Sequence, residues 1–186
     1  MMDLEYFPIS GPILIRTRTF EDNRGSFTES FNLEAFSNAR LPHTFVQDNQ
    51  SISKKGVIRG LHYQKQPFAQ GKLVRVVKGS AWDVAVDIRA GSPTFGQHIS
   101  VLLSENEPSQ LWIPEGFAHG FAALEDGTCF LYKCTNYYSP QHEIGIRWND
   151  PALGIDWGIE HPIVSDKDMA LPELNQNLND FIYVLT

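Results

Sequence analysis

Short stretches in which apolar and polar residues alternate recur along most of the chain, and this pattern constrains the fold more than any other feature. Turn-forming residues separate the stretches, as in Lys78-Gly79-Ser80 and Asp126-Gly127. Alternation with a period of two is typical of strands with one buried face. Many such strands at near-regular spacing indicate an all-β, antiparallel sandwich or barrel. We expect strands at residues 27–31, 44–51, 57–64, 72–78, 82–88, 97–103, 110–113, 117–124 and 128–136.

A few short helices and one more strand complete the expected elements. Asn32 is a suitable N-cap for a helix over residues 33–38. Ser165 and Asp168 have the Ser-x-x-acid spacing of a capping box, which predicts a second helix after Ser165. Residues 181–185 have the pattern of a final strand. Because no repeat or linker divides the chain, residues 1–186 are expected to form a single domain.

Composition and charge exclude several classes of protein. The formal net charge of -7 argues against a general nucleic-acid binder, although a few local cations could still hold one anionic ligand. No apolar run approaches the roughly 20 residues of a membrane span, and the N-terminus lacks the pattern of a signal peptide. Cys129 and Cys134 lie five positions apart on an expected strand, so they should face opposite sides and not bond to each other. We therefore expect a cytoplasmic protein without membrane association.

The segment from Arg59 to Gln64 contains the first candidate for chemistry. Arg59 and His62 are three positions apart, so strict alternation would place them on opposite faces of a strand. Gly60 between them permits a β-bulge, which would turn both side chains toward one cavity. The alternative is a histidine that packs in the core and hydrogen-bonds a carbonyl.

Other candidates have an ordinary structural explanation that the local sequence favours or leaves open. Lys72 shares a face with Val74, as either an edge lysine or a cation aimed into a pocket. Tyr132 is either a core aromatic or a polar group of a site, and His119 is either packed or on a pocket wall. From the local sequence, a role in the helix capping box is favoured over a catalytic role for Asp168.

Metal and cofactor signatures are weak in this sequence. The residue two positions after His62 is Gln64, where a metal-binding histidine barrel usually needs a second histidine. His98, His119, His142 and His161 offer no close pair. The chain also has no glycine-rich nucleotide loop and no nucleophile elbow.

Several longer motifs follow one another along nearly the whole chain. They occupy residues 20–29, 47–51, 59–64, 70–74, 83–87, 92–96, 112–121 and 145–151. Taken together, residues 5–175 resemble the dTDP-4-dehydrorhamnose 3,5-epimerase family of the cupin fold. The resemblance implies an antiparallel jelly-roll barrel with a few short helices.

The resemblance also implies a reaction and places four residues in one catalytic site. The substrate would be dTDP-4-dehydro-6-deoxy-D-glucose, inverted at C3 and C5 to dTDP-4-dehydro-L-rhamnose in rhamnose biosynthesis. His62 would be the base and Asp168 would orient it. Lys72 would stabilise the enolate that forms at the C4 oxygen, and Tyr132 would donate a proton from the opposite face. No metal and no cofactor are implied.

The family's substrate-contacting positions and its assembly carry over in the same way. Similar proteins are homodimers in which the N-terminal strand region of one subunit completes the site of the other. The implied partners are the dTDP-linked 4-keto sugar and a second copy of the chain. The substrate-contacting positions are Arg24, Phe27, Glu29, Gln47, Asp48, Asn49, Arg59, His119, Tyr138, Glu143 and Lys167.

Three alternative functions stay open on the sequence alone. The first is an epimerase that inverts only C3 or only C5 of a related dTDP-4-keto-deoxy sugar. The second is a cupin that binds a sugar nucleotide without catalysis. The third is a metal-dependent oxygenase, which the histidine spacing disfavours.

Overall fold

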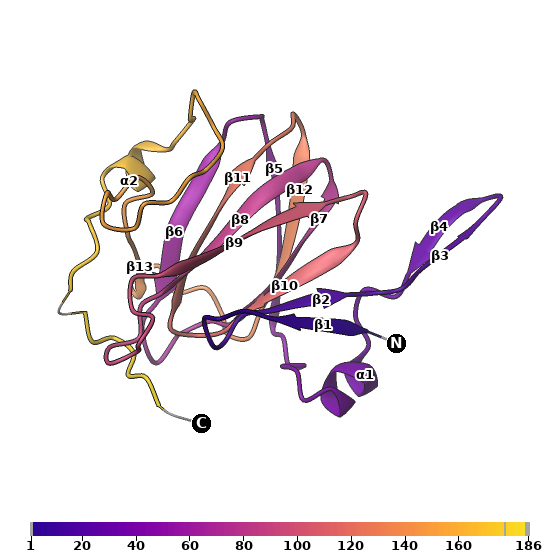
Figure 1. Ribbon diagram of the computed structural model, residues 1–186, viewed down its shortest axis with the longest axis horizontal. Coiled ribbons are helices and arrows are strands. Elements are labelled where there is room, and N and C mark those ends of the chain that lie inside the picture. Colours follow the sequence, from indigo (N-terminus) through magenta and orange to yellow (C-terminus); the bar gives the residue numbers. More distant parts are fainter. Residues whose placement is uncertain (1, 177, 185–186) are drawn as a thin grey trace.

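The computed structural model describes residues 2–176 and 178–184, and this part of the chain is built almost entirely from strands (Figure 1). Two short helices, α1 (Leu33–Asn38) and α2 (Asp166–Met169), lie outside the sheets. The strands are β1 (Asp3–Tyr6), β2 (Ile13–Arg16), β3 (Thr19–Asp22), β4 (Gly25–Thr28), β5 (Gln47–Ser53), β6 (Ile58–Gln64), β7 (Lys72–Lys78), β8 (Ser80–Asp87), β9 (His98–Ser104), β10 (Ser109–Ile113), β11 (Phe117–Ala123), β12 (Thr128–Cys134) and β13 (Glu143–Gly145).

Two antiparallel sheets pack face to face. One sheet has the order β1-β2-β10-β7-β12-β5 and the other has the order β13-β6-β11-β8-β9. Side chains from both inner faces form one buried core, with Val74 and Phe130 from the first sheet against Ala85 and Phe121 from the second. The expected all-β, antiparallel architecture is confirmed.

Alternation along the strands of the second sheet decides which residues reach the space between the sheets. On β8, Ala85 belongs to this inner core, whereas Val84 and Val86 belong to a second core on the outer face. On β11, Phe117 and Phe121 point inward, with His119 in step between them. Period-two geometry therefore places His119 on the inner side of the sheet.

The chain after β13 covers the outer face of the second sheet. Ile146, Leu153, Trp157 and Leu174 pack there against residues of β6, β8 and β11. This layer carries α2 to a position beside β6, as Figure 1 shows. A segment late in the sequence is thereby brought next to a strand that begins near residue 58.

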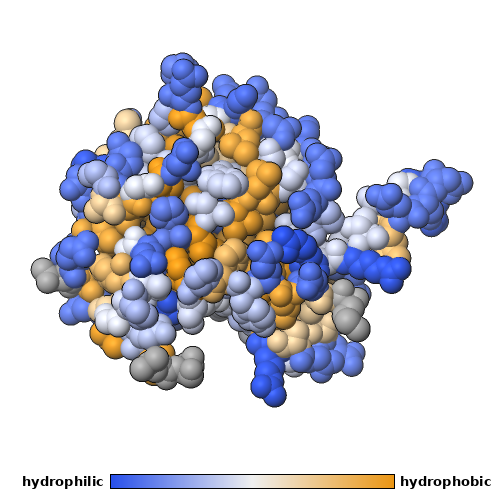
Figure 2. All heavy atoms as spheres, in the orientation of Figure 1, coloured by the Kyte–Doolittle hydropathy of each residue, from blue (hydrophilic) through white to orange (hydrophobic). Residues whose placement is uncertain are grey.

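The third sheet has only two strands, β3 and β4, and extends away from the two main sheets as a hairpin arm (Figure 1). Figure 2 shows the arm as a projection whose tip is hydrophilic. Its two phenylalanines are solvent-accessible, with Phe20 50% and Phe27 67% exposed. The arm makes few contacts with the two main sheets of its own chain. Phe20 lines a hollow with Met2 and Leu4 at the base of the arm, whereas Phe27 lies along the arm itself.

The sequence predicted most of the elements that form the two sheets, with shifts at their ends. The helix at residues 33–38 and its Asn32 cap are confirmed, since the Asn32 side chain accepts a hydrogen bond from the Ala35 N–H. The second helix begins after Ser165, as expected. The strand expected at residues 27–31 ends at Thr28. Strands β1, β2, β3 and β13 were not predicted.

The expected final strand is wrong within the described residues. From 181 to 184 the chain makes one isolated bridge, between Ile182 and Ala90, and Leu185 lies outside the described residues. Cys129 and Cys134 are both free, as predicted. In the part of the chain that the structure describes, no helix combines the length and apolar character needed to cross a membrane.

Candidate active site

A bulge in β6 brings Arg59 and His62 to the same side of the strand, as the sequence predicted. His62 pairs with His119 and Arg59 pairs with Phe121, so three steps on β6 oppose two steps on β11. Gly60 occupies the bulge with φ of +130°, and a Cβ there would lie 2.5 Å from the Gly120 Cα. The close approach of the two strands excludes any larger residue, and both Arg59 and His62 line one cavity.

His62 is held by a carboxylate from the other end of the chain. Its Nε2 lies 2.7 Å from Oδ1 of Asp168, and the Gly60 N–H donates to Oδ2 of the same carboxylate at 3.2 Å. Burial raises the pKa of Asp168, but the hydrogen bond and charge of His62, the Gly60 N–H and the charge of Lys167 together hold this pKa below its ordinary value. An ionised Asp168 accepts a hydrogen bond from the Nε2–H group of His62, which leaves the Nδ1 lone pair free to act as a base.

The capping box at the start of α2 combines two functions that the sequence presented as alternatives. The Ser165 side chain caps the helix by accepting from the Asp168 N–H at 3.1 Å. The Asp168 carboxylate is not used for capping, because it turns to His62 and the Gly60 backbone. One residue therefore contributes its backbone to the cap and its side chain to the site.

Lys72 and Tyr132 come from neighbouring strands of the opposite sheet. In the pairing of β12 with β7, Tyr132 lies opposite Val74 and Cys134 lies opposite Lys72. Val74 belongs to the inner core, and Lys72 is two positions before it, so the side chains of Lys72 and Tyr132 both face inward. Burial lowers the pKa of Lys72, an effect that the nearby Cys134, Glu143 and Asp83 oppose. Burial raises the pKa of Tyr132, which keeps its hydroxyl protonated at neutral pH.

His62, Lys72 and Tyr132 line two adjoining cavities whose walls come from both sheets. The cavities have volumes of about 360 and 410 Å³, and all three residues line both. The first is also lined by Gln47, Asn49, Tyr63, Gln64, Gln70, Tyr138 and Glu143. The second is also lined by Gln50, Ser51, Arg59, His119, Phe121, Phe130, Ser165, Lys167 and Asp168. The two cavities therefore share a base (His62), a cation (Lys72) and a phenol (Tyr132).

A second histidine–carboxylate pair supports the wall of the cavity. His119 Nε2 lies 2.9 Å from Oδ2 of Asp83, which is fully buried. Burial lowers the pKa of His119, partly opposed by Asp83. The Asp83 Oδ1 atom is buried without a hydrogen-bond partner among the described residues. Sequence reasoning missed Asp83 as a site residue, although a carboxylate in the apolar stretch 82–88 was a usable signal.

Three polar side chains meet at the rim of the cavities. The Tyr138 hydroxyl donates to Oε2 of Glu143 at 2.8 Å, and the Lys167 ammonium forms an ion pair with the same oxygen. Burial alone would raise the pKa of Glu143, but these hydrogen bonds from Lys167 and Tyr138 lower it below its ordinary value. Arg59 donates to the Ser53 hydroxyl at 3.2 Å nearby. The rim thus presents two cations and an aromatic ring.

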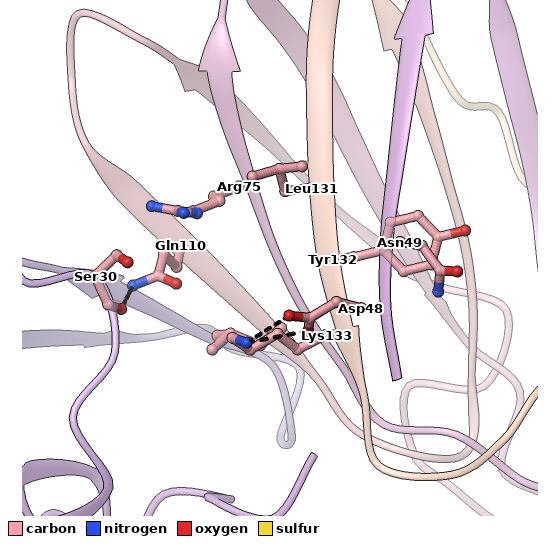
Figure 3. Close-up of a pocket in the computed structure, with 9 residues that line it drawn as sticks. Ser30, Asp48, Asn49, Arg75, Gln110, Leu131, Tyr132 and Lys133 are labelled. Atoms are coloured by element: carbon pink, nitrogen blue, oxygen red, sulfur yellow. Dashed lines mark hydrogen bonds and ion pairs between the residues drawn. The ribbon is translucent and has the colours of Figure 1, made fainter. Parts of the chain in front are cut away.

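Four of the expected substrate-contacting residues lie outside these cavities. Arg24 and Phe27 are on the hairpin arm, where Arg24 pairs with Asp22, and Glu29 follows the arm. Asp48 points to the outer face of the first sheet, where it pairs with Lys133 (Figure 3). In the same view Asn49 and Tyr132 extend to the other side of the sheet. Alternation along β5 therefore separates Asp48 from Gln47 and Asn49.

The described residues contain no group of three or more histidine, cysteine, aspartate or glutamate side chains arranged to hold a metal ion. The hydrogen-bond partners of His62 and His119 are the carboxylates of Asp168 and Asp83, one for each imidazole. Each imidazole is therefore paired with one carboxylate in a way that suits proton transfer.

Comparison with known proteins gives a consistent result over nearly the whole chain. A family model for dTDP-4-dehydrorhamnose 3,5-epimerase matches residues 6–176. The dTDP-4-dehydrorhamnose 3,5-epimerase of Salmonella typhimurium is 54% identical over 168 residues, which cover 89% of this chain and 92% of that protein.

Solved structures agree with the sequence comparison. A 3,5-epimerase from Legionella pneumophila, solved with dTDP-4-keto-L-rhamnose bound, matches with a TM-score of 0.93 and 45% identity over the full length of both chains. A 3'-monoepimerase from Streptomyces bikiniensis, solved with dTDP-quinovose, matches with a TM-score of 0.85 and 34% identity, covering 90% of this chain and 85% of that one. The fold is therefore the cupin jelly roll.

Proposed function

This chain belongs to the dTDP-4-dehydrorhamnose 3,5-epimerase family, and on that premise we propose that it inverts C3 and C5 of dTDP-4-dehydro-6-deoxy-D-glucose. The product is dTDP-4-dehydro-L-rhamnose, an intermediate in the biosynthesis of dTDP-rhamnose. The observation that carries the proposal is the convergence of His62, Lys72 and Tyr132 on shared cavity walls, with Asp168 bonded to His62. These are the groups that proton transfer beside a ketone requires.

The first half of each inversion is removal of a proton from carbon. Nδ1 of His62 takes the proton from C3 or C5, and the electrons of the broken C–H bond form a C=C bond. The C4 carbonyl oxygen becomes an enolate, whose negative charge the Lys72 ammonium stabilises. Asp168 stabilises the imidazolium that forms, because its own pKa is low enough to keep it ionised.

The second half returns a proton to the opposite face of the sugar. The enolate electrons return to the carbon, which takes a proton from the Tyr132 hydroxyl as the C4 carbonyl is restored. Tyr132 regains its proton from solvent and His62 loses its proton to solvent, so the net reaction is an isomerisation. His62 and Tyr132 come from opposite sheets, and this placement supports attack from two faces.

We expect Tyr132→Phe to separate proton exchange from inversion. His62 still removes the proton, so substrate recovered from deuterated water should carry deuterium with unchanged configuration. Formation of inverted product should fall by about 10²–10⁴-fold, because the general acid is lost. NMR of the recovered sugar nucleotide measures both quantities. If exchange and inversion fall equally, Tyr132 is not the donor.

The nucleotide part of the substrate needs a few local cations and an aromatic ring. Arg59 and Lys167 line the second cavity, and Arg59 can present a planar fork to diphosphate oxygens. Tyr138, which lines the first cavity together with Gln47, Asn49 and Glu143, would stack on the thymine. A net charge of -7 is compatible with an anionic ligand because only these residues need to converge.

We propose that the chain works as a single-domain subunit of a homodimer, in which each arm completes the partner's site. The arm exposes Phe27 and Arg24. Figure 1 shows it on the opposite side of the molecule from β6, the strand that carries His62, which supports action in a second copy. The outer face of the first sheet also exposes Ile52 (65%) and Val77 (41%), a surface available for a partner. Arg24 and Phe27 would then contact the nucleotide held by the other subunit.

Complementation between two inactive variants tests this arrangement. An arm variant carrying Arg24→Ala and Phe27→Ala should lose substrate binding, and His62→Ala should lose chemistry. When the two are co-expressed, a mixed dimer has one site with an intact His62 and an intact arm. With random pairing we expect activity to return to roughly a quarter of the native value.

The outcome depends on whether the arm serves its own chain or the partner. If the arm acts within its own chain, no combination restores a complete site and the mixture stays inactive. Each variant expressed alone provides the baseline, and sedimentation measures the dimer. A monomer with native activity would also contradict the arrangement.

The stereochemistry of the product tests the proposed function. Incubation with the 4-keto sugar nucleotide should give a product inverted at both C3 and C5, identified from the ring coupling constants by NMR. Inversion at one carbon would instead assign the chain to the single epimerases. Activity should be undiminished by a metal chelator, which would inhibit a metal-dependent enzyme. We place the reaction in the cytoplasm, a location that the unpaired Cys129 and Cys134 support.

A further inference from the structure

The side chain of Gln64 makes three hydrogen bonds to the backbone, although the residue has no role in the chemistry described above. Its Nε2 donates to the Phe68 carbonyl at 2.6 Å and to the Tyr137 carbonyl at 3.1 Å. Its Oε1 accepts from the Ser139 N–H at 2.7 Å. Gln64 is 4% exposed, at the end of the strand that carries His62. A buried amide with its donors and acceptor satisfied is a strong local constraint.

Two further glutamines hold the same segment from other directions. Oε1 of Gln47, on β5, accepts from the Tyr138 N–H at 2.9 Å. Nε2 of Gln70, just before β7, donates to the Asn136 carbonyl at 2.7 Å. The backbone of residues 136–139 is therefore fixed by three side chains from three separate parts of the fold. We call these three residues, Gln47, Gln64 and Gln70, the amide clamp.

The side chain at the centre of the clamped segment is much freer than its backbone. Tyr138 is 50% exposed, and its hydroxyl is bonded to Glu143. Its ring is not buried in the core, so the direction in which it projects is set by the backbone and by the hydrogen bond to Glu143. The Ser139 carbonyl also accepts from the Glu143 N–H at 3.1 Å. Gln64 thus fixes the segment that positions both Tyr138 and Glu143.

We propose that Gln64 is a positioning residue for nucleotide recognition, which acts by holding residues 137–139 so that the Tyr138 ring is preoriented to stack on the base. This inference rests on the proposed function, since it assigns Tyr138 to the thymine of a dTDP-linked substrate. A ring presented on a rigid backbone loses little freedom when a base stacks on it, and affinity increases accordingly. The strands that hold His62, Lys72 and Tyr132 are fixed by their own ladders.

Gln64→Leu tests the proposal through binding and kinetics. We expect the dissociation constant for dTDP, measured by calorimetry, and the KM of the sugar nucleotide to rise by about tenfold, as for partial loss of one aromatic–base stack. The kcat at saturating substrate should stay within about twofold of the native value. Gln97→Leu is the matched control, because the Gln97 side chain is exposed in a loop and has no hydrogen bond within the described chain.

Gln64→Glu covers the case in which Gln64→Leu does not fold. It retains the acceptor for the Ser139 N–H but replaces the amide donor with an oxygen facing two carbonyls. The dissociation constant for dTDP should rise in the same direction. An unchanged dissociation constant in a folded Gln64→Glu or Gln64→Leu variant would overturn the proposal.

A double-mutant cycle with Tyr138→Ala separates positioning from general structural damage. If Gln64 acts through the Tyr138 ring, Gln64→Leu should weaken dTDP binding no further once the ring is removed. If the losses of dTDP binding from Gln64→Leu and Tyr138→Ala are additive, the inference is overturned. In the kinetic experiment, an equal fall in kcat and in kcat/KM for Gln64→Leu would also overturn it. The cycle uses dTDP binding alone, so a native protein that binds dTDP without turnover would refute the proposed reaction while still testing Gln64. A native protein that does not bind dTDP would refute both.

Discussion

His62→Ala is expected to reduce epimerisation by about 10²–10⁴-fold, the contribution of a general base. His62 is the imidazole that Asp168 orients in the shared cavity, with its Nε2 2.7 Å from the carboxylate. The other imidazole that lines this cavity, His119, is bonded to Asp83 through Nε2, so it is not oriented by Asp168 as His62 is. Proton exchange between substrate and solvent should fall together with product formation, because both require the first proton transfer.

The same variant distinguishes an enzyme from a binding protein. The candidate nucleotide-contacting residues Tyr138, Arg59 and Lys167 do not depend on His62 for their position, so the dissociation constant for dTDP should change little. His161→Ala is the matched control, because His161 is exposed in a loop outside the cavities. If the native protein binds dTDP but does not epimerise the sugar nucleotide, the chain is a non-catalytic sugar-nucleotide-binding protein.

Lys72→Met is expected to lower kcat by about 10²–10³-fold, the cost of removing one preorganised oxyanion-stabilising group. Methionine keeps an unbranched apolar stem in the inward-facing position next to Val74, but it cannot neutralise the charge on the enolate oxygen. The charge appears only as the proton leaves, so the loss should affect kcat more than KM. The KM of the sugar nucleotide should therefore stay within about threefold of its native value.

Steady-state kinetics at saturating and limiting substrate measures both constants. Lys78→Met is the matched control, since Lys78 ends the same strand but is exposed. If Lys72→Met raises KM and leaves kcat unchanged, Lys72 is a phosphate- or sugar-binding cation and does not stabilise the enolate. Equal effects of Lys78→Met and Lys72→Met would point to a loss of general surface charge.

The fold was predictable where local patterns agree with burial. Strand β7 and helix α1 have the predicted limits, because alternating valines and the Asn32 cap act within a few residues. Strands β1 and β13 were missed because they are short. In addition, β13 pairs with β6, which lies far away in the sequence. Near the end of the chain, Ile182 makes one bridge and Phe181 packs against apolar residues, which an alternating pattern does not distinguish from a strand.

The site was predictable in part for the same reason. Gly60 signalled the bulge that turns Arg59 and His62 together, since only glycine fits the approach of Gly120. The 106-residue separation of His62 and Asp168 left no local signal, and the family resemblance was needed to bring them together. Asp83 was missed because its role depends on a neighbouring strand. Asp48 was predicted as a site residue from its motif, but alternation along β5 directs its side chain away from the cavity.

Incubation of the native protein with the 4-keto sugar nucleotide in deuterated water tests the central claim most directly. If one imidazole removes protons from both carbons beside the ketone, the product should carry one deuterium at C3 and one at C5, with no label elsewhere on the ring. Mass spectrometry gives the number of deuterium atoms and NMR gives their positions. Unlabelled sugar after prolonged incubation, or label confined to a single carbon, would contradict the account.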